Sequence, residues 1–379
     1  GGGGVVSGGT GKGAAAGAAW VQVTAGGNAS AEGLRQSADW GADWAAVAAL
    51  ARQASGSTAY EAVVGFPEGG ADVHVRSDLR GLALNLPAPL DKPQDAAWPL
   101  HVELGPLAGS AGRERLRVRL ADRLALDYER QAGAAGAPAR VLRGAIAVGA
   151  LGEGAAAAPA LPAAGVPAQL KWPALDVDAW ERALDRMGEA APAPPQAATS
   201  AATPPAVPAA ASAPAADEYL PTRVAVQVDT LQVDDRTLHA VDVNATRNGT
   251  RWSAQVQARE LAGRVEYTPG ADGSAGAVHA RLSRLAIAAS DAPESGALEQ
   301  PSTRIPALDV VVDDFELHGR KLGRLEVQAV NRDVGAGRAA GGNAVQEWQL
   351  TRLALAVPEA SLSASGRWAA QPRAPALPT

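Results

Sequence analysis

The chain has 379 residues, a formal net charge of −6 and a sequence pI of about 5.5. This balance argues against a nucleic-acid partner, because no excess of basic side chains is available to neutralise phosphates. The chain contains no cysteine, which excludes disulfides and thiolate metal sites. The sequence has no uncharged apolar run of about 18 residues, the length that a membrane-spanning helix needs. We expect the chain to be part of a longer protein, with any export signal or membrane anchor upstream of Gly1.

Residues 1–58 are rich in glycine and alanine and contain one candidate helix, Ala38–Gln53. Within this segment, Gly8–Gly13 has a superficial likeness to a phosphate-binding loop. Such a loop needs a glycine where Val6 stands and a hydroxyl side chain where Gly13 stands. We therefore interpret Gly8–Gly13 as a flexible loop or terminus.

Residues 59–189 form a region with period-two alternation at Ala71–Leu86 and Leu116–Leu126, which predicts strands. Four arginines at a spacing of two share one face of a strand. We interpret this face as a solvated sheet surface beside Glu114 and Asp122, in preference to a phosphate or lipid-headgroup patch. The four are Arg113, Arg115, Arg117 and Arg119.

A short helix is predicted over 177–187, at the end of this region. Asp176 is a suitable N-cap. Apolar side chains then recur at helical spacing at Val177, Trp180, Leu184 and Met187.

Residues 190–216 are uncharged and consist mainly of proline, alanine, serine and threonine. Such a segment cannot bury enough apolar surface to offset the entropy lost on ordering. We predict a semi-extended linker here.

Residues 217–379 alternate strongly, as at Val224–Val228, and Asn248-Gly249 predicts a hairpin turn because glycine accepts a positive φ. The segment also contains an internal repeat, in which Val228–Val233 matches Val312–Leu317. The repeat defines two related strand modules, at about 220–267 and 305–368. Strand modules that stack edge to edge build an elongated sheet.

No catalytic, metal-binding or cofactor-binding pattern is recognisable in the sequence. The five histidines are scattered, and none has metal-ligand spacing near acidic partners. The carboxylate pairs Asp234–Asp235 and Asp313–Asp314 do not align in the repeat, which argues against a shared acid–base role. A Gly-x-Ser-x-Gly motif is also absent. We therefore expect a protein that is not an enzyme and uses no cofactor.

Four stretches carry a family resemblance. They are Ser77–Pro93, with a Leu-Pro-Ala-Pro-Leu-x-Lys-Pro loop; Leu175–Trp180, with Asp-x-Asp-x-Trp; Ile305–Val310, continuing through Leu322–Leu325 to Trp348; and Val357–Trp368. Together they resemble the YhdP-type proteins of Gram-negative bacteria, which belong to the AsmA-like group. The resemblance implies a periplasmic region of a protein anchored in the inner membrane by an N-terminal helix. It further implies a long β-sheet with a hydrophobic groove that moves phospholipids towards the outer membrane.

Sequence and resemblance together predict a mostly β fold: an elongated, curved antiparallel sheet, groove-like and built from repeats, with a few short helices. The groove would bind phospholipid acyl chains, and other envelope proteins are further candidate partners. Its candidate lining residues alternate along the strands that follow the linker. They are Val224, Val226, Val228, Leu231, Val233, Val241, Val243, Val310, Val312, Leu325, Val327, Leu353 and Leu355.

The same alternation also fits the core of a closed β-sandwich. A second hypothesis is therefore a structural or protein-interaction scaffold of the cell envelope that carries no lipid. An open groove along the sheet favours the lipid conduit, and a closed sandwich with a polar outer surface favours the scaffold.

Overall fold

A computed structural model of the chain describes residues 4–7, 21–37, 44–67, 70–133, 138–149, 160–188, 217–233, 236–270, 276–288, 306–334, 345–357 and 360–369. The predicted linker, the Gly8–Gly13 stretch and Asp234–Asp235 lie outside these residues. The chain divides into two compact units, Gly1–Arg223 and Val224–Thr379. The fold is mostly β, with open, curved, mostly antiparallel sheet and a few short helices, as the sequence predicts.

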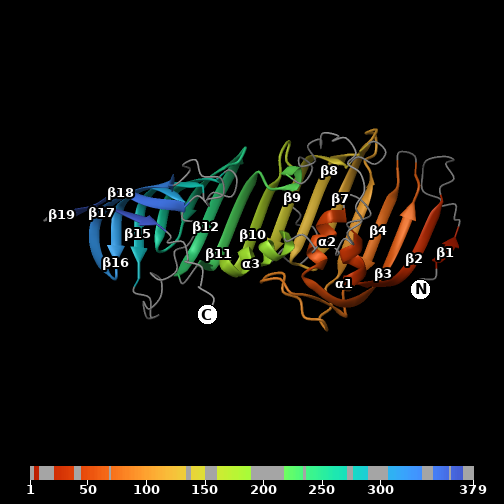
Figure 1. Cartoon of the computed structure of the whole chain (residues 1–379). Coiled ribbons are helices and arrows are strands. Elements are labelled where there is room, and N and C mark those ends of the chain that lie inside the picture. Colours follow the sequence, from red (N-terminus) through yellow and green to blue (C-terminus); the bar gives the residue numbers. More distant parts are fainter. Residues whose placement is uncertain are drawn as a thin grey trace, which may run out of the picture. The chain divides into compact units, whose positions relative to one another are not determined.

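The sheet of the first unit follows chain order, with each strand beside the next (Figure 1). All these neighbours are antiparallel except β9 and β10, which are parallel. The short strand β5 departs from this order, because it pairs with the start of β3 while β4 pairs directly with β6. The strands are β1 (Gly4–Ser7), β2 (Gln22–Ser30), β3 (Ala54–Gly65), β4 (Asp72–Ser77), β5 (Leu82–Leu84), β6 (Leu100–Pro106), β7 (Arg113–Leu120), β8 (Leu124–Gln131), β9 (Arg140–Gly149) and β10 (Pro167–Asp176).

The helices described in this unit are α1 (Ala31–Arg35), α2 (Ala45–Ala51) and α3 (Val177–Gly188), with a 3₁₀ turn, η3, at Asp217–Tyr219. Helix α2 lies within the span predicted to be helical. Helix α3 confirms the prediction for 177–187, and the Asp176 carboxylate caps it by accepting from the Ala179 amide at 2.8 Å.

Of the predicted apolar stripe of α3, Val177, Trp180 and Met187 are half-buried, and only Leu184 departs from it. Ala183 is fully buried, whereas Leu184 is 56% exposed. A methyl side chain lets a helix approach its support more closely than a leucine does.

A hydrophobic core closes one end of the first unit. The loop after β4 brings Leu79, Leu82, Leu84 and Trp98 against Leu120 of β7. Lys92, in the same loop, is 1% exposed, and its Nζ donates to the carbonyl oxygens of Leu82 (2.7 Å) and Pro93 (3.0 Å). Burial lowers the pKa of the Lys92 ammonium, although Asp78 and Asp95 act in the opposite direction. The Leu-Pro-Ala-Pro-Leu-x-Lys-Pro loop is therefore part of the core.

The sheet of the second unit also follows chain order (Figure 1). From β12 to β19, neighbouring strands are antiparallel except β15 and β16, which are parallel. Asn248 lies opposite Arg251, and Gly249 has φ +61°, which confirms the predicted hairpin turn. The strands are β11 (Arg223–Val233), β12 (Arg236–Asn248), β13 (Arg251–Gln257), β14 (Leu261–Thr268), β15 (Ala277–Ile287), β16 (Ala307–Leu317), β17 (Arg320–Val334), β18 (Val345–Val357) and β19 (Ala360–Ala369).

A β-bulge in β16 explains how the repeat keeps its apolar side chains together. Val312 and Phe315 are three residues apart, so a regular strand would point them to opposite faces. The register shifts between them, and both are buried, at 0% and 7% exposure, while Asp313 and Asp314 are exposed. The extra residue restores the phase of the alternation.

Substitution of Val312 by alanine tests this core. We expect Val312→Ala to lower the free energy of unfolding by about 2 kcal/mol, from the lost methyl groups and the cavity they leave. Val311→Ala, the half-buried neighbour on the opposite face, should cost clearly less. Urea unfolding followed by circular dichroism measures both, and equal losses would contradict the assignment of faces.

Candidate functional site

The second unit has one continuous apolar face. Because cross-strand partners project to the same side of a sheet, the register places two rows of mostly aliphatic residues across β12 to β19. At about 4.8 Å per strand, each row spans about 34 Å. One row is Val243, Val256, Gly263, Leu282, Val312, Leu325, Leu355 and Leu362. The other is Ala245, Ala254, Val265, Ala280, Val310, Val327, Leu353 and Ala364.

The structure brings most of the predicted groove residues onto this face. Val243, Val310, Val312, Leu325, Val327, Leu353 and Leu355 lie in the two rows. Gln227 donates to Asp242 at 3.2 Å, and Asp242 belongs to the opposite face, so alternation puts Val226, Val228 and Val241 with the rows. By the same alternation Val224 joins them.

Leu231 and Val233 lie in β11 beyond Asp229, where the alternation of exposed and buried residues changes phase. Both are half-buried, and the matching residues of the other repeat, Phe315 and Leu317, belong to the apolar cluster.

The apolar face is partly open to solvent. Of the predicted groove residues, Val228, Val241 and Val312 are buried and the others are half-buried. Their burial comes from packing along the curved sheet, since the main contacts between described strands of this unit all join sheet neighbours. The described part of the unit contains no helix. It is therefore a single-layered sheet, and its apolar face lacks the second layer of a closed sandwich.

The opposite face of this sheet is polar. It carries a row of Thr246, Ser253, Glu266, His279, Asp309, Gln328 and Arg352. Arg281 and Asp309 form an ion pair at 2.8 Å on this face, and the hydrogen bond from Arg281 holds the pKa of the Asp309 carboxyl below its usual value. The sheet is thus amphipathic, with its two faces differing in chemistry along the whole row.

The first unit has an apolar face of the same kind, which the sequence analysis did not propose as a binding surface. The signal that could have identified this face was the alternation at Val73 and Val75 and at Leu116 and Val118, which was used only to predict strands. One row is Val23, Val64, Val73, Leu104, Leu116 and Tyr128, and the next is Ala25, Ala62, Val75, Val102, Val118, Leu126, Ile146 and Ala168.

The four arginines of β7 do share one face, but their environment differs from the prediction. The Arg115 guanidinium donates to both carboxylate oxygens of Asp127, at 2.8 and 2.6 Å. Glu129 accepts from both Arg113 and Arg143, and its side chain is 3% exposed. Glu114, a predicted neighbour, lies on the opposite face, where it binds Arg130. We call this set of ion pairs between arginines and cross-strand carboxylates the ion-pair lattice. Only the pairing of the strands, which the sequence does not give, could reveal it.

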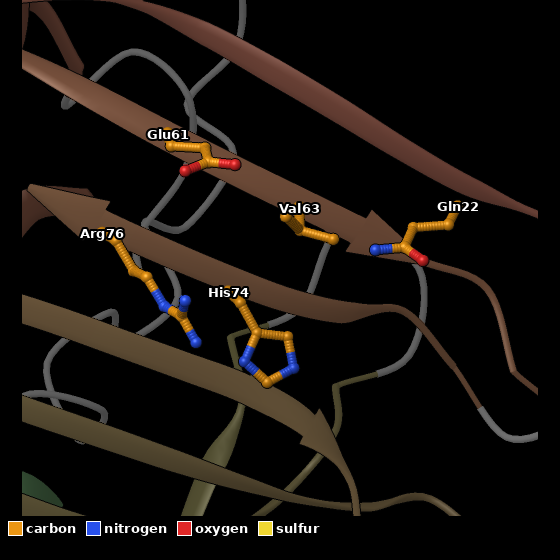
Figure 2. Close-up of a pocket in the computed structure, with 5 residues that line it drawn as sticks. All are labelled: Gln22, Glu61, Val63, His74 and Arg76. Atoms are coloured by element: carbon orange, nitrogen blue, oxygen red, sulfur yellow. The ribbon is translucent and has the colours of Figure 1, made fainter. Parts of the chain in front are cut away.

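A shallow pocket of about 260 Å³ lies on this polar face (Figure 2). Its lining comes from β2, β3 and β4, and the register puts Glu61 opposite Arg76 and Val63 opposite His74. His74 Nε2 lies 3.2 Å from Asp72 Oδ2. The lining residues Gln22, Glu61, Val63, His74 and Arg76 all face away from the apolar rows.

The model of the YhdP protein family matches residues 10–376. The chain belongs to the YhdP family. No curated protein and no solved structure matches it. The family resemblance seen in the sequence is thereby confirmed, and one of the stretches that carries it, Ser77–Pro93, supplies much of the core of the first unit.

The described part of the chain carries neither a metal-ligand cluster nor a membrane-spanning helix. No group of three or more histidine, aspartate or glutamate side chains there is placed to hold a metal ion. None of the helices described is long and apolar enough to cross a membrane. The amphipathic sheets are thus the most extended chemical feature of the described part of the chain.

The ion-pair lattice should make stability depend on pH. Hydrogen bonds from Arg143 and then Arg113 lower the pKa of the Glu129 carboxyl below 4.5. The ionised Glu129 carboxylate therefore stabilises the fold fully above about pH 4.5, the ordinary pKa of glutamate. This stabilisation is lost as the pH falls through the lower pKa of the folded state. We expect Glu129→Gln to cost about 2 kcal/mol at pH 7, with the difference narrowing in acid.

Urea unfolding between pH 7 and pH 3 measures this effect. Glu61→Gln, which removes an exposed carboxylate from the same face, is the control and should change stability by less than about 0.5 kcal/mol. A Glu129→Gln deficit that stays constant with pH would contradict the role given to the ionised carboxylate.

Proposed function

We propose that the apolar faces of the two sheets bind phospholipid acyl chains and shield them from water during transport between the inner and outer membranes. The observation that carries the proposal is the pair of apolar rows that cross β12 to β19, mostly half-buried and covered by no second layer among the residues that the structure describes. In a protein with only a scaffold role, we would expect another layer of the fold to cover such an apolar face.

The energetics explain why a continuous apolar surface serves this purpose. Exposing an acyl chain to water costs about 0.8 kcal/mol per methylene. Two chains with roughly 30 methylenes would therefore cost more than 20 kcal/mol, which thermal motion does not supply. A row of aliphatic side chains offsets the cost of exposing the methylenes along the whole apolar face. Such binding of acyl chains needs no specific polar contact.

This function is binding and transport, without catalysis, cofactor or nucleic acid. Membership of the YhdP family supports a place in the cell envelope. We propose that this region lies in the periplasm and that an inner-membrane helix outside this chain anchors it. Envelope proteins are further proposed partners.

Photo-crosslinking tests the assignment of the lipid-binding face. A photoreactive amino acid at Leu353, on the apolar face, should crosslink to phospholipid in a bacterial envelope. The same amino acid at Arg352, its neighbour on the polar face, should give little lipid adduct. Mass spectrometry of the adducts provides the measurement, and equal labelling from both positions, or none from either, would refute the proposal.

Charge substitution gives a second, independent test. Val310→Asp places a carboxylate between Ala280 and Val327 and should reduce co-purified phospholipid at least several-fold, because a charge on an apolar surface is costly to desolvate. Val311→Asp is the matched control, since it makes the same change on the opposite face beside Arg281. Native mass spectrometry measures the lipid, and circular dichroism confirms that both variants fold. A folded native chain without lipid would favour the scaffold.

A further inference from the structure

One arginine of the first unit is held between two tryptophan rings. The Arg123 guanidinium carbon lies 4.5 Å from the ring centroid of Trp98 and 5.2 Å from that of Trp172. Arg123 belongs to the turn between β7 and β8, Trp98 to the loop before β6, and Trp172 to β10. Stacking against aromatic rings fixes the plane of a guanidinium and adds a cation–π attraction.

The position of this cluster relates it to the apolar face. Leu124 lies opposite Val148, which lies opposite Leu170, so the three form a further apolar row. Trp172 follows Leu170 by two residues in the same strand and therefore points to the same side. The guanidinium thus lies at the end of the apolar face, on the side where acyl chains would lie.

Most of the hydrogen-bonding capacity of Arg123 is unused within the described part of the chain. Its Nη1 donates to the Pro89 carbonyl oxygen at 3.2 Å. The nearest carboxylate oxygen, on the 72%-exposed side chain of Asp122, is 4.0 Å from Nε, too far for a hydrogen bond. The Arg123 side chain is 29% exposed, so solvent and ligands can reach it. A guanidinium has five N–H donors in a planar fork that matches the oxygens of phosphate.

We propose that Arg123 binds the phosphate group of a lipid whose acyl chains lie on the apolar face of the first unit. The inference rests on the proposed function and adds the residue that recognises the headgroup. The tryptophans position the guanidinium and form the boundary between the apolar rows and water, where amphipathic aromatic rings are well suited. A free phosphate ion has the same oxygen chemistry, and the experiment must separate the two sources.

Titration calorimetry of the full chain with three probes tests the proposal. The probes are a short-chain phosphatidylglycerol, the diacylglycerol with the same chains, and inorganic phosphate. Arg123→Gln should weaken phosphatidylglycerol binding about tenfold or more, because it removes charge-assisted hydrogen bonds. Diacylglycerol binding should be unchanged, because that lipid lacks the phosphate. Arg119→Gln, on the polar face of the same hairpin, is the control and should change neither affinity.

The outcomes separate this inference from the function on which it rests. If Arg123→Gln weakens both lipids equally, the stack has only a structural role and the inference is wrong. If it weakens neither, Arg123 does not contact the headgroup, while lipid binding itself stands. Inorganic phosphate that binds as tightly as the lipid would make this a free-phosphate site and overturn the proposal. A native chain that binds neither lipid would refute the proposed function as well.

Discussion

The two-residue period of the β-strand is the constraint on which this protein depends. A slip of one residue would move every aliphatic side chain of a strand to the polar face. The apolar side chains remain on one face over eight strands because the strands pair in register. Where the apolar spacing departs from two residues, as between Val312 and Phe315, a β-bulge keeps both side chains on the same face. Gly263 belongs to the same pattern: it has φ +148°, and a Cβ there would lie 2.6 Å from the Cα of Leu282. The chain at this point can approach its neighbour only without a side chain.

The two faces of each sheet are stabilised by different means. On the apolar face of the second unit, side chains of neighbouring strands shield one another, so that Val312 is fully buried among described residues of the same sheet. On the polar face of the first unit, arginines of β7 bind carboxylates of β8 across the strands. These ion pairs join β7 to β8 in addition to the backbone hydrogen bonds of the two strands. The candidate binding surface can therefore stay open without weakening the sheet that carries it.

Local patterns allowed much of this structure to be predicted. Alternation gave the strands, Asp176 gave the start of α3, and Asn248-Gly249 gave a turn, because each depends on residues close together in the chain. Features that join distant segments were not predictable. The ion partners of Arg115 lie in the next strand, and the ring pair around Arg123 comes from residues 98 and 172. Burial of Ala183 in place of Leu184 likewise depends on what the helix packs against.

Each described strand of the second unit touches mainly its immediate neighbours, so the apolar cluster around Val312 and Phe315 is built from strands that are adjacent in the sheet. Whole hairpins can then be gained or lost in evolution without repacking the rest, as in other repeat proteins. Each strand changes the length of the apolar face by about 4.8 Å, so a four-strand module such as β16–β19 corresponds to about 19 Å. The length of the proposed lipid-binding face can therefore be set by the number of strands, with the surface chemistry left unchanged.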